Sequence, residues 1–252
     1  MLDNYQDSIA SQNDKQRSFH YSEIQQEFSS KQAHQIPAYI ESVYYWSYIN
    51  PRNVNWLDRE WIVKIILWWQ HARLRNTAFC EIKAGDKVLQ TAAVYGIFSS
   101  ALAKHLGVNG QLNVIDIAPI QVSITQKKLS GYPNTNVSLE DATTCQVSPE
   151  TKVILSYFLL HEVPDDYKQK ILDNLLNQLP LGSKLVLVDY HKPHWAHPLK
   201  PLMSVIFNTL EPFAKSFWKN DIKDFSEKQN KFNWEKSTFF GGLYQKVVVT
   251  RK

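Results

Sequence analysis

From Asp86 onward, apolar residues recur along the chain with two alternating periods, one typical of strands and one typical of helices. Short apolar runs that predict buried strands occupy 87–93, 111–118, 136–142, 152–160 and 184–191. Between these runs, apolar side chains repeat at helical spacing, as at Phe98, Leu102 and Leu106. This alternation predicts an α/β fold with a doubly wound, mostly parallel sheet, which is a Rossmann-like architecture.

The end of the chain departs from this alternation. An amphipathic, lysine-flanked pattern predicts a long helix at 199–218. The last segment, from STFFGGLY to QKVVVTRK, predicts a hairpin with Gly241 and Gly242 near its turn. We therefore expect the parallel sheet to carry an antiparallel C-terminal edge.

The stretch before the alternation has a third pattern, in which aromatic side chains crowd several faces. Pro37 and Pro51 punctuate it, which predicts helices at about 37–49 and 56–75. These aromatic N-terminal helices would form either a packing layer or a lid over an apolar substrate.

The same patterns divide the chain into three parts. Residues 1–35 lack apolar periodicity and predict a polar flexible arm. A single domain would then span 36–252, with a helical cap at 36–80 and a Rossmann-like core at 86–252. The arm is also too polar for a secretory signal.

Composition removes two large classes of nucleotide-binding enzyme. The chain has eight glycines, and no two of them are separated by a single residue. It therefore has neither the G-x-G loop of ordinary nicotinamide dehydrogenases nor the P-loop of nucleotide hydrolases. Cys80 and Cys145 form no C-x-x-C motif, which favours a reducing compartment over a disulfide framework.

The residues that follow the first three predicted strands indicate a nucleotide-type cofactor. In the S-adenosylmethionine-dependent methyltransferase fold, the first loop reads acid-x-G-x-G-x-G. Aligned on Gly96, the segment LQTAAVYGIFS places Gln90 at the acid and Ala92 at a glycine. Tyr95 lies beside this loop, where it could stack on a planar substrate or form a hydrogen bond with it.

Acidic residues follow the next two strands in the expected order. Asp116, followed by Ile117, stands where this fold binds ribose hydroxyls, and Asp141-Ala142 stands where it contacts adenine. Ligands of open α/β sheets lie beyond the carboxyl ends of the strands. Together these residues predict an S-adenosylmethionine site, although a lone aspartate at a strand end is usually a turn residue.

Candidate catalytic residues follow the fourth and fifth strands. His161 and Glu162 come after the fourth, and Tyr190 and His191 end the fifth. Histidine and carboxylate side chains can act as general bases or as ligands of manganese. Glu162 could equally cap a helix, and the pattern assigns no metal ligands.

Several long strings resemble one family, the rhodoquinone biosynthesis methyltransferase-like proteins (the RquA family). They are VLQTAAVYG, VIDIAPIQV, FLLHEVPDDYK, VDYHKP, LEPFA and TFFGGLYQKVV, and the aromatic YYWSYINP and IILWW are similar as well. The resemblance covers about 36–250 and implies a class I methyltransferase fold. It implies conversion of ubiquinone to rhodoquinone, in which an amino group replaces a ring methoxy group. S-adenosylmethionine would be the amino donor, with a divalent metal such as manganese assisting.

One position departs from the family, because Ile97 stands where its signature V-Y-G-acid-F-S has an acid. Isoleucine can bind neither a cofactor amino group nor a metal. Two other functions therefore stay open. One is conventional methyl transfer to a quinone or another apolar aromatic, and the other is a catalytically silent quinone-binding scaffold.

The resemblance also bears on partners and location. A ubiquinone-like apolar quinone, together with the amphipathic 199–218 segment, favours peripheral contact with a membrane. Residues 191–252 hold eleven Lys and Arg against five Asp and Glu, which suits an anionic membrane face or a solvated surface. We expect a cytoplasmic protein on the inner membrane, with no nucleic-acid partner.

Overall fold

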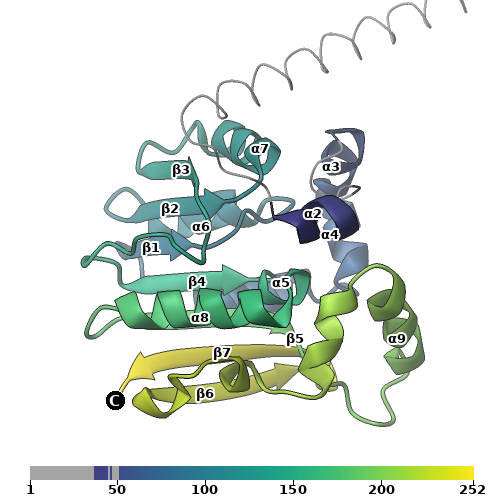
Figure 1. Ribbon diagram of the computed structural model, residues 1–252. Coiled ribbons are helices and arrows are strands. Elements are labelled where there is room, and N and C mark those ends of the chain that lie inside the picture. The colour runs from purple at the N-terminus through teal and green to yellow at the C-terminus, as the bar shows by residue number, and fades with distance from the viewer. Residues whose placement is uncertain (1–36, 45, 47–50) are drawn as a thin grey trace, which may run out of the picture.

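The computed structural model describes residues 37–44, 46 and 51–252, and within them seven strands form one sheet of order β3-β2-β1-β4-β5-β7-β6 (Figure 1). The strands are β1 (Lys87–Gln90), β2 (Gln111–Asp116), β3 (Thr135–Leu139), β4 (Val153–Tyr157), β5 (Lys184–Tyr190), β6 (Phe232–Phe239) and β7 (Tyr244–Arg251). Strands β1 to β5 run parallel, and β7 pairs antiparallel with both β5 and β6. The predicted sheet with its antiparallel edge is thus confirmed. The predicted arm at 1–35 lies outside the described residues.

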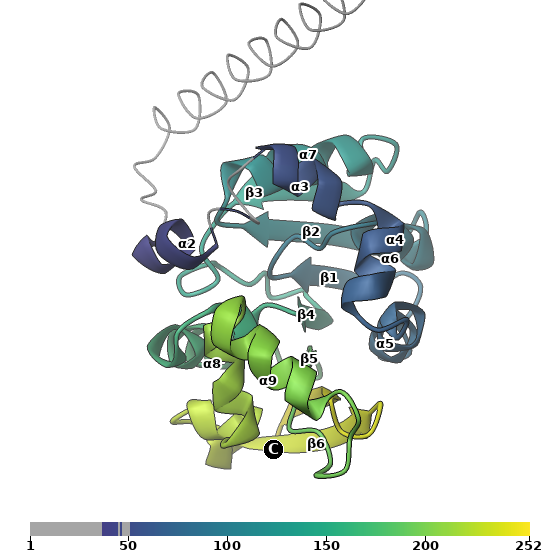
Figure 2. The same cartoon turned by 90° about the vertical axis from the view of Figure 1, so that its right-hand side faces the viewer.

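Helices cover both faces of this sheet and its carboxyl edge (Figure 2). The α-helices are α2 (Ala38–Val43), α3 (Pro51–Leu57), α4 (Glu60–Ile66), α5 (His71–Phe79), α6 (Phe98–Leu106), α7 (Pro119–Leu129), α8 (Asp165–Gln178) and α9 (Lys200–Thr209). The 3-10 helices are η2 (Leu160–Glu162), η3 (Pro212–Trp218), η4 (Ile222–Phe225) and η5 (Gln229–Lys231). Helices α5 and α6 lie on one face and α8 on the other, whereas α2, α3, α4 and α9 lie beyond the carboxyl ends of the strands.

The core is centred on β4 and β5, which are apolar on both faces because helices cover both. Every residue of β4 is buried. The predicted helix face of Phe98, Leu102 and Leu106 packs into the same core. Burying one such leucine stabilises the fold by about 1.5–3 kcal/mol, so this arrangement fixes the carboxyl edge firmly.

Both long helices predicted from the sequence are interrupted. The helix predicted at 56–75 is divided among the end of α3, α4 and α5, and its second break is at Trp68 and Trp69, whose φ angles are 50° and 60°. The helix at 199–218 ends at Thr209, because Pro212 has no N–H to continue it and forces Glu211 out of helical geometry. Each interruption turns side chains toward the carboxyl edge of the sheet.

The strands are also shorter than the apolar runs that predict them. Strand β4 ends at Tyr157, and Phe158, with a φ of 54°, still donates its N–H to the Val188 carbonyl of β5 at 2.8 Å. Beyond the strand, Phe158 and Leu159 line the pockets of the site, and Leu160 packs in the core. The apolar run therefore continues past the strand because its last residues line a pocket or fill the core.

Candidate functional site

Two pockets open side by side at the carboxyl ends of the strands, and both are lined by Ala93 and Glu162. We call one the acidic pocket; it is lined by residues that include Tyr39, Tyr44, Asp116, Glu140, Asp141 and Glu162. We call the other the aromatic pocket; it is lined by residues that include Trp46, Tyr95, Phe98, Tyr157, Phe158 and Tyr190. The shared wall means that ligands in the two pockets would meet.

Asp116 organises the acidic pocket from the end of β2. Its two carboxylate oxygens accept the backbone N–H groups of Ala93, at 2.9 Å, and Ala118, at 2.8 Å. Burial raises the Asp116 pKa to about 6, against the opposing effect of these backbone hydrogen bonds. The carboxylate therefore ties the loop after β1 to the end of β2; with Ile117 also donating to it, part of its acceptor capacity remains for a ligand.

The structure brings five of the predicted cofactor-binding residues together in this pocket. They are Ala92, Asp116, Ile117, Asp141 and Ala142. They come from the carboxyl ends of three neighbouring strands, β1, β2 and β3, as expected for a parallel sheet. The Asp141 carboxylate accepts the N–H of Thr143 at 2.7 Å, which holds the loop after β3.

Two other predicted cofactor residues lie outside both pockets. Gln90 is fully buried, and its amide donates to the Ala92 carbonyl at 2.7 Å and to Ser99 Oγ at 3.0 Å. Gly96 has a φ of 74°, and a Cβ there would meet Glu60 Oε2 at 2.6 Å. Gln90 thus supports the loop after β1 through hydrogen bonds, and the absence of a side chain at Gly96 leaves room for Glu60 of α4.

The N-terminal segment occupies the polar backbone groups of this loop. Asp58 accepts the Gly96 N–H at 2.9 Å and forms an ion pair with Lys128, which donates to the Gly96 carbonyl at 3.0 Å. Glu60 accepts the Ile97 N–H at 3.2 Å. These backbone groups are therefore already satisfied by the protein.

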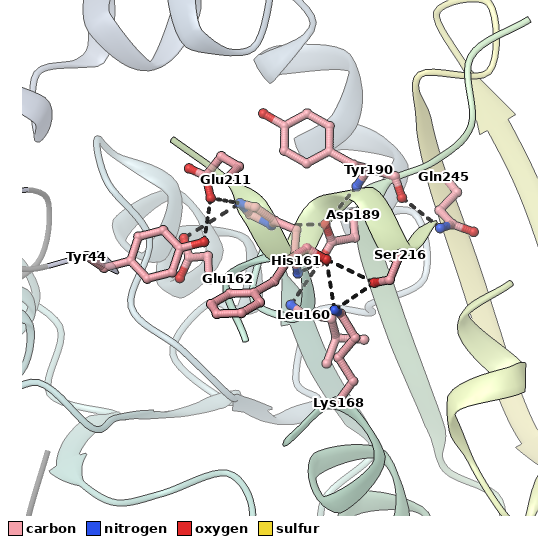
Figure 3. A network of polar contacts seen from close by, with 11 residues as sticks. Tyr44, Leu160, His161, Glu162, Lys168, Asp189, Tyr190, Glu211, Ser216 and Gln245 are labelled. Atoms are coloured by element: carbon pink, nitrogen blue, oxygen red, sulfur yellow. Dashed lines mark hydrogen bonds and ion pairs between the residues drawn. The ribbon is translucent and has the colours of Figure 1, made fainter. Parts of the chain in front are cut away.

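His161 is the centre of a buried polar network that the aromatic pocket reaches (Figure 3). Its Nδ1 lies 3.0 Å from Asp189 Oδ1, and Asp189 also accepts the N–H groups of Leu160 and His161 at 3.0 and 3.2 Å. Its Nε2 lies 3.8 Å from Glu162 and 3.9 Å from Glu211. Burial lowers the His161 pKa, but the surrounding carboxylates outweigh it and raise the pKa to about 9. The imidazole is consequently protonated near neutral pH.

Glu211 enters this network from the segment between α9 and η3. The hydroxyl of Tyr44, which follows α2, donates to Glu211 Oε2 at 2.8 Å. Burial raises the Glu211 pKa, while His161 and Tyr44 oppose that shift. The fully buried Lys168 holds η3 in place by donating to the Phe213 carbonyl at 2.9 Å.

Sequence reasoning missed Glu211 as a site residue because a continuous helix was expected there. The signal was available in the Glu-Pro pair, since a residue before proline leaves the helical region. His71 and Arg75 of α5 also line the aromatic pocket, and neither was predicted. They are placed there by the break at Trp68 and Trp69, which no local pattern indicates.

Of the predicted catalytic residues, four line the aromatic pocket and one does not. Those in the lining are Tyr95, His161, Glu162 and Tyr190. The Tyr95 hydroxyl accepts from Gln121 at 2.8 Å, and burial raises the pKa of Tyr95 and Tyr190, so both stay neutral. His191 lies outside both pockets, where its Nδ1 is 2.9 Å from the Gly242 carbonyl.

Among the residues that the structure describes, no group of three or more His, Cys, Asp or Glu side chains is placed to hold a metal ion. The manganese prediction thus has no ligand set in this part of the chain. Within the same residues, none of the helices combines the length and apolar character needed to cross a bilayer.

No protein-family model and no curated protein matches the sequence. Among solved structures, a methyltransferase dependent on S-adenosylmethionine from Aquifex aeolicus is 17% identical, with a TM-score of 0.52 over 79% of this chain and 97% of that chain. The N-methyltransferase NodS from Bradyrhizobium japonicum, solved with S-adenosyl-L-homocysteine, is 12% identical, with a TM-score of 0.55 over 85% and 99%.

A third structure is the mitomycin 7-O-methyltransferase MmcR, which is 15% identical with a TM-score of 0.60, over 81% of this chain and 58% of that chain. The sequence identities of all three structures show a shared fold and do not assign their activities to this chain. The strand order and these likenesses together show that the chain has the class I S-adenosylmethionine-dependent methyltransferase fold.

Proposed function

We propose that the chain is an S-adenosylmethionine-binding transferase that modifies the ring of an apolar, ubiquinone-like quinone. The observation that carries this proposal is the pair of pockets that meet at Ala93 and Glu162. One is acidic and lies where the fold binds its nucleoside, and the other is apolar and aromatic. Group transfer requires a donor and an acceptor held in contact, and the shared wall supplies that contact.

The residues of the acidic pocket fit the proposed cofactor. Carboxylates line it, namely Asp116, Glu140, Asp141 and Glu162. The remaining acceptor capacity of Asp116 can receive a ribose hydroxyl, and the acidic lining attracts a cationic sulfonium. When bound, S-adenosylmethionine would supply the group that is transferred.

The reaction that we favour would replace a ring methoxy group by an amino group, as the family resemblance implies; a ring carbon–nitrogen bond would form, and the methoxy group would leave as methanol with a proton from the amine. A protonated His161 supports it, because an imidazolium that donates to a quinone carbonyl makes the ring more electrophilic. The loop backbone offers further support. The N–H groups of Gly96 and Ile97 already donate to Asp58 and Glu60. They are therefore not available to hydrogen-bond the methionine part of the cofactor.

Methyl transfer to a ring hydroxyl is the second candidate. It is favoured by the His161–Asp189 pair, which could accept the hydroxyl proton while the sulfonium carbon–sulfur bond breaks and an oxygen–methyl bond forms. In this reaction His161 must be neutral. The two candidates therefore require opposite protonation states of one side chain.

We also propose that the protein binds a membrane surface through a rim beside the aromatic pocket. We define the rim by its exposed apolar side chains, which are Trp56, Trp61, Ile65, Trp69, Trp195, Leu202 and Val205. Most of them belong to α3, α4 and α9, which lie beyond the carboxyl edge (Figure 2). Tryptophan favours the membrane–water interface, and an apolar quinone would reach the pocket from there.

The test is expression in a ubiquinone-making host, followed by lipid extraction and quinone profiling by mass spectrometry. Loss of a methoxy group with gain of an amino group supports the favoured reaction, and gain of a methyl group supports the second. Activity between pH 6 and 10 gives an independent criterion. Amino exchange would fall as pH rises through about 9, whereas methyl transfer would rise. Calorimetry that detects no S-adenosylmethionine binding would leave only a silent scaffold.

A further inference from the structure

Helix α5 presents a second polar group to the aromatic pocket. His71 and Arg75 are four residues apart on this helix, so they lie on one face, and both line the pocket. Among the residues that the structure describes, none forms an ion pair or hydrogen bond with the Arg75 guanidinium. His71 Nδ1 is buried without a hydrogen-bond partner, and its Nε2 lies 3.6 Å from Glu60 Oε1.

An unpartnered guanidinium against an apolar lining is unfavourable, because its five N–H donors lose water without gaining acceptors. Other arginines of the described chain are placed differently. Arg251 donates to the carbonyls of Leu179 and Asn177 at 2.6 and 3.1 Å, and Arg73 is exposed over the Phe239 ring at 5.4 Å. Arg75 is partly buried, and an oxygen of a ligand bound in the pocket would supply the acceptor that the described residues do not give it.

The surroundings of Arg75 define what that acceptor can be. Tyr157 lies close to Arg75. Burial raises the Tyr157 pKa, and the positive charge of Arg75 opposes that rise. Apart from the Glu60 carboxylate beside His71, the neighbouring lining is mainly apolar, with the Phe98 and Tyr157 rings 4.1 Å apart between centroids. Burial lowers the His71 pKa, so its imidazole is neutral at pH 7. An apolar ring that carries an electron-rich oxygen fits such a wall.

We propose that Arg75, assisted by His71, anchors an oxygen of the ring substrate on the α5 wall. His161 comes from η2, which follows β4, and so belongs to a different wall of the same pocket. A ring with oxygens on opposite edges, such as a para-quinone, would be held from both walls. This inference rests on the proposed function, and it adds a determinant of substrate orientation.

The experiment measures ring binding by quenching of tryptophan fluorescence with two probes. One is the tail-free dimethoxy-methyl-benzoquinone ring of ubiquinone, and the other is dimethoxytoluene, which lacks the carbonyl oxygens. For Arg75→Met we expect the benzoquinone Kd to rise roughly 10- to 100-fold, the range for a hydrogen bond to a charged group. The dimethoxytoluene Kd should change by less than about twofold. Arg75→Lys should recover part of the loss, because it restores the charge without the fork of donors.

Arg73→Met is the matched control, since Arg73 lies on the same helix but outside the pocket. The melting temperature of Arg75→Met should equal or exceed that of the wild type, because the variant removes an unpaired cation. A large drop would mean that the fold needs the guanidinium and would overturn the proposal. Equal weakening of both probes would also overturn it, since only pocket shape would then matter.

The two proposals can fail separately. If the wild type binds both probes equally well, the oxygen anchor is wrong while a ring-binding transferase still stands. If it binds neither probe, the proposed function itself fails, and the anchor fails with it. Calorimetry with S-adenosylmethionine on Arg75→Met should match the wild type, because Arg75 does not line the acidic pocket.

Discussion

The acidic pocket and the aromatic pocket share a wall but are built in different ways. The acidic pocket is formed mainly at the ends of β1, β2 and β3, where backbone N–H groups of the loops after these strands hold Asp116 and Asp141. The aromatic pocket gathers side chains that are far apart in sequence, from Trp46 to Glu211. Sheet topology alone determines most of the first pocket, whereas the second depends on where helices break. The first suits a common cofactor and the second a particular substrate.

The largest expected effect is on His161, which belongs to the aromatic pocket alone. His161→Gln should lower kcat roughly 10²- to 10⁴-fold, the usual contribution of a positioned proton donor or acceptor. Its Kd for S-adenosylmethionine, measured by calorimetry, should change by less than about twofold. A comparable loss of cofactor affinity in His161→Gln would mean that the two pockets do not bind their ligands independently.

His105→Gln is the control for that substitution. His105 lies on α6 outside both pockets, and its Nε2 is 2.8 Å from the Ile82 carbonyl. We expect full activity, so a loss in this variant would mean that histidine removal perturbs the fold generally. Circular dichroism of both variants would show whether they retain native helix and sheet content.

The next prediction concerns how the free energy of unfolding changes with pH. The His161 pKa rises from 6.5 to about 9 on folding, so its stabilisation is fully present below pH 6.5 and lost as pH rises through 9. At 1.36 kcal/mol for each pKa unit, the loss is on the order of 3 kcal/mol at most. Urea unfolding at pH 6, 7.5 and 9 should show this decline in the wild type and a shallower one in His161→Gln. Identical declines would locate the titrating group elsewhere.

A change of similar size is expected in the other pocket. Asp116→Ala removes the carboxylate that would accept a ribose hydroxyl, and the loss of that charged hydrogen bond should raise the Kd for S-adenosylmethionine about 10- to 100-fold. Asp86→Ala is the control, because Asp86 likewise accepts a backbone N–H, from Lys83 at 2.8 Å, but lines neither pocket. Binding of dimethoxytoluene should persist in both variants. If Asp116→Ala no longer bound dimethoxytoluene, the structure of the aromatic pocket would depend on that of the acidic pocket.

These two pockets also mark what could be predicted from the sequence. Asp116, Asp141 and His161 were found because each follows an apolar run, and the carboxyl ends of parallel strands meet at one edge. The same reasoning predicted the strand alternation and the terminal hairpin. Strand ends were overestimated, since apolar residues such as Phe158 line the site instead of extending a strand.

Residues that depend on tertiary placement were not predictable in this way. Arg75 reaches the aromatic pocket only because the chain turns at Trp68 and Trp69, in a conformation that bulky residues rarely adopt. His191 ends a strand as expected, but its ring bonds to Gly242 and lies outside both pockets. Spacing locates the end of a strand, and packing decides which side chains point into the pocket.

The smallest expected effect tests whether the rim extends the aromatic pocket to a lipid surface. Trp56 and Trp61 are each about half exposed and in contact, with ring centroids 6.1 Å apart. Replacing both by serine should lower binding to vesicles containing phosphatidylglycerol by roughly three- to tenfold in a sedimentation assay. Val108 and Leu181, exposed in loops at the opposite edge of the sheet, form the matched control pair for serine substitution. Equal losses in the two pairs would mean that binding follows general surface apolarity. If only the rim substitutions lowered vesicle binding, the result would support a membrane-facing aromatic pocket and a water-facing acidic pocket.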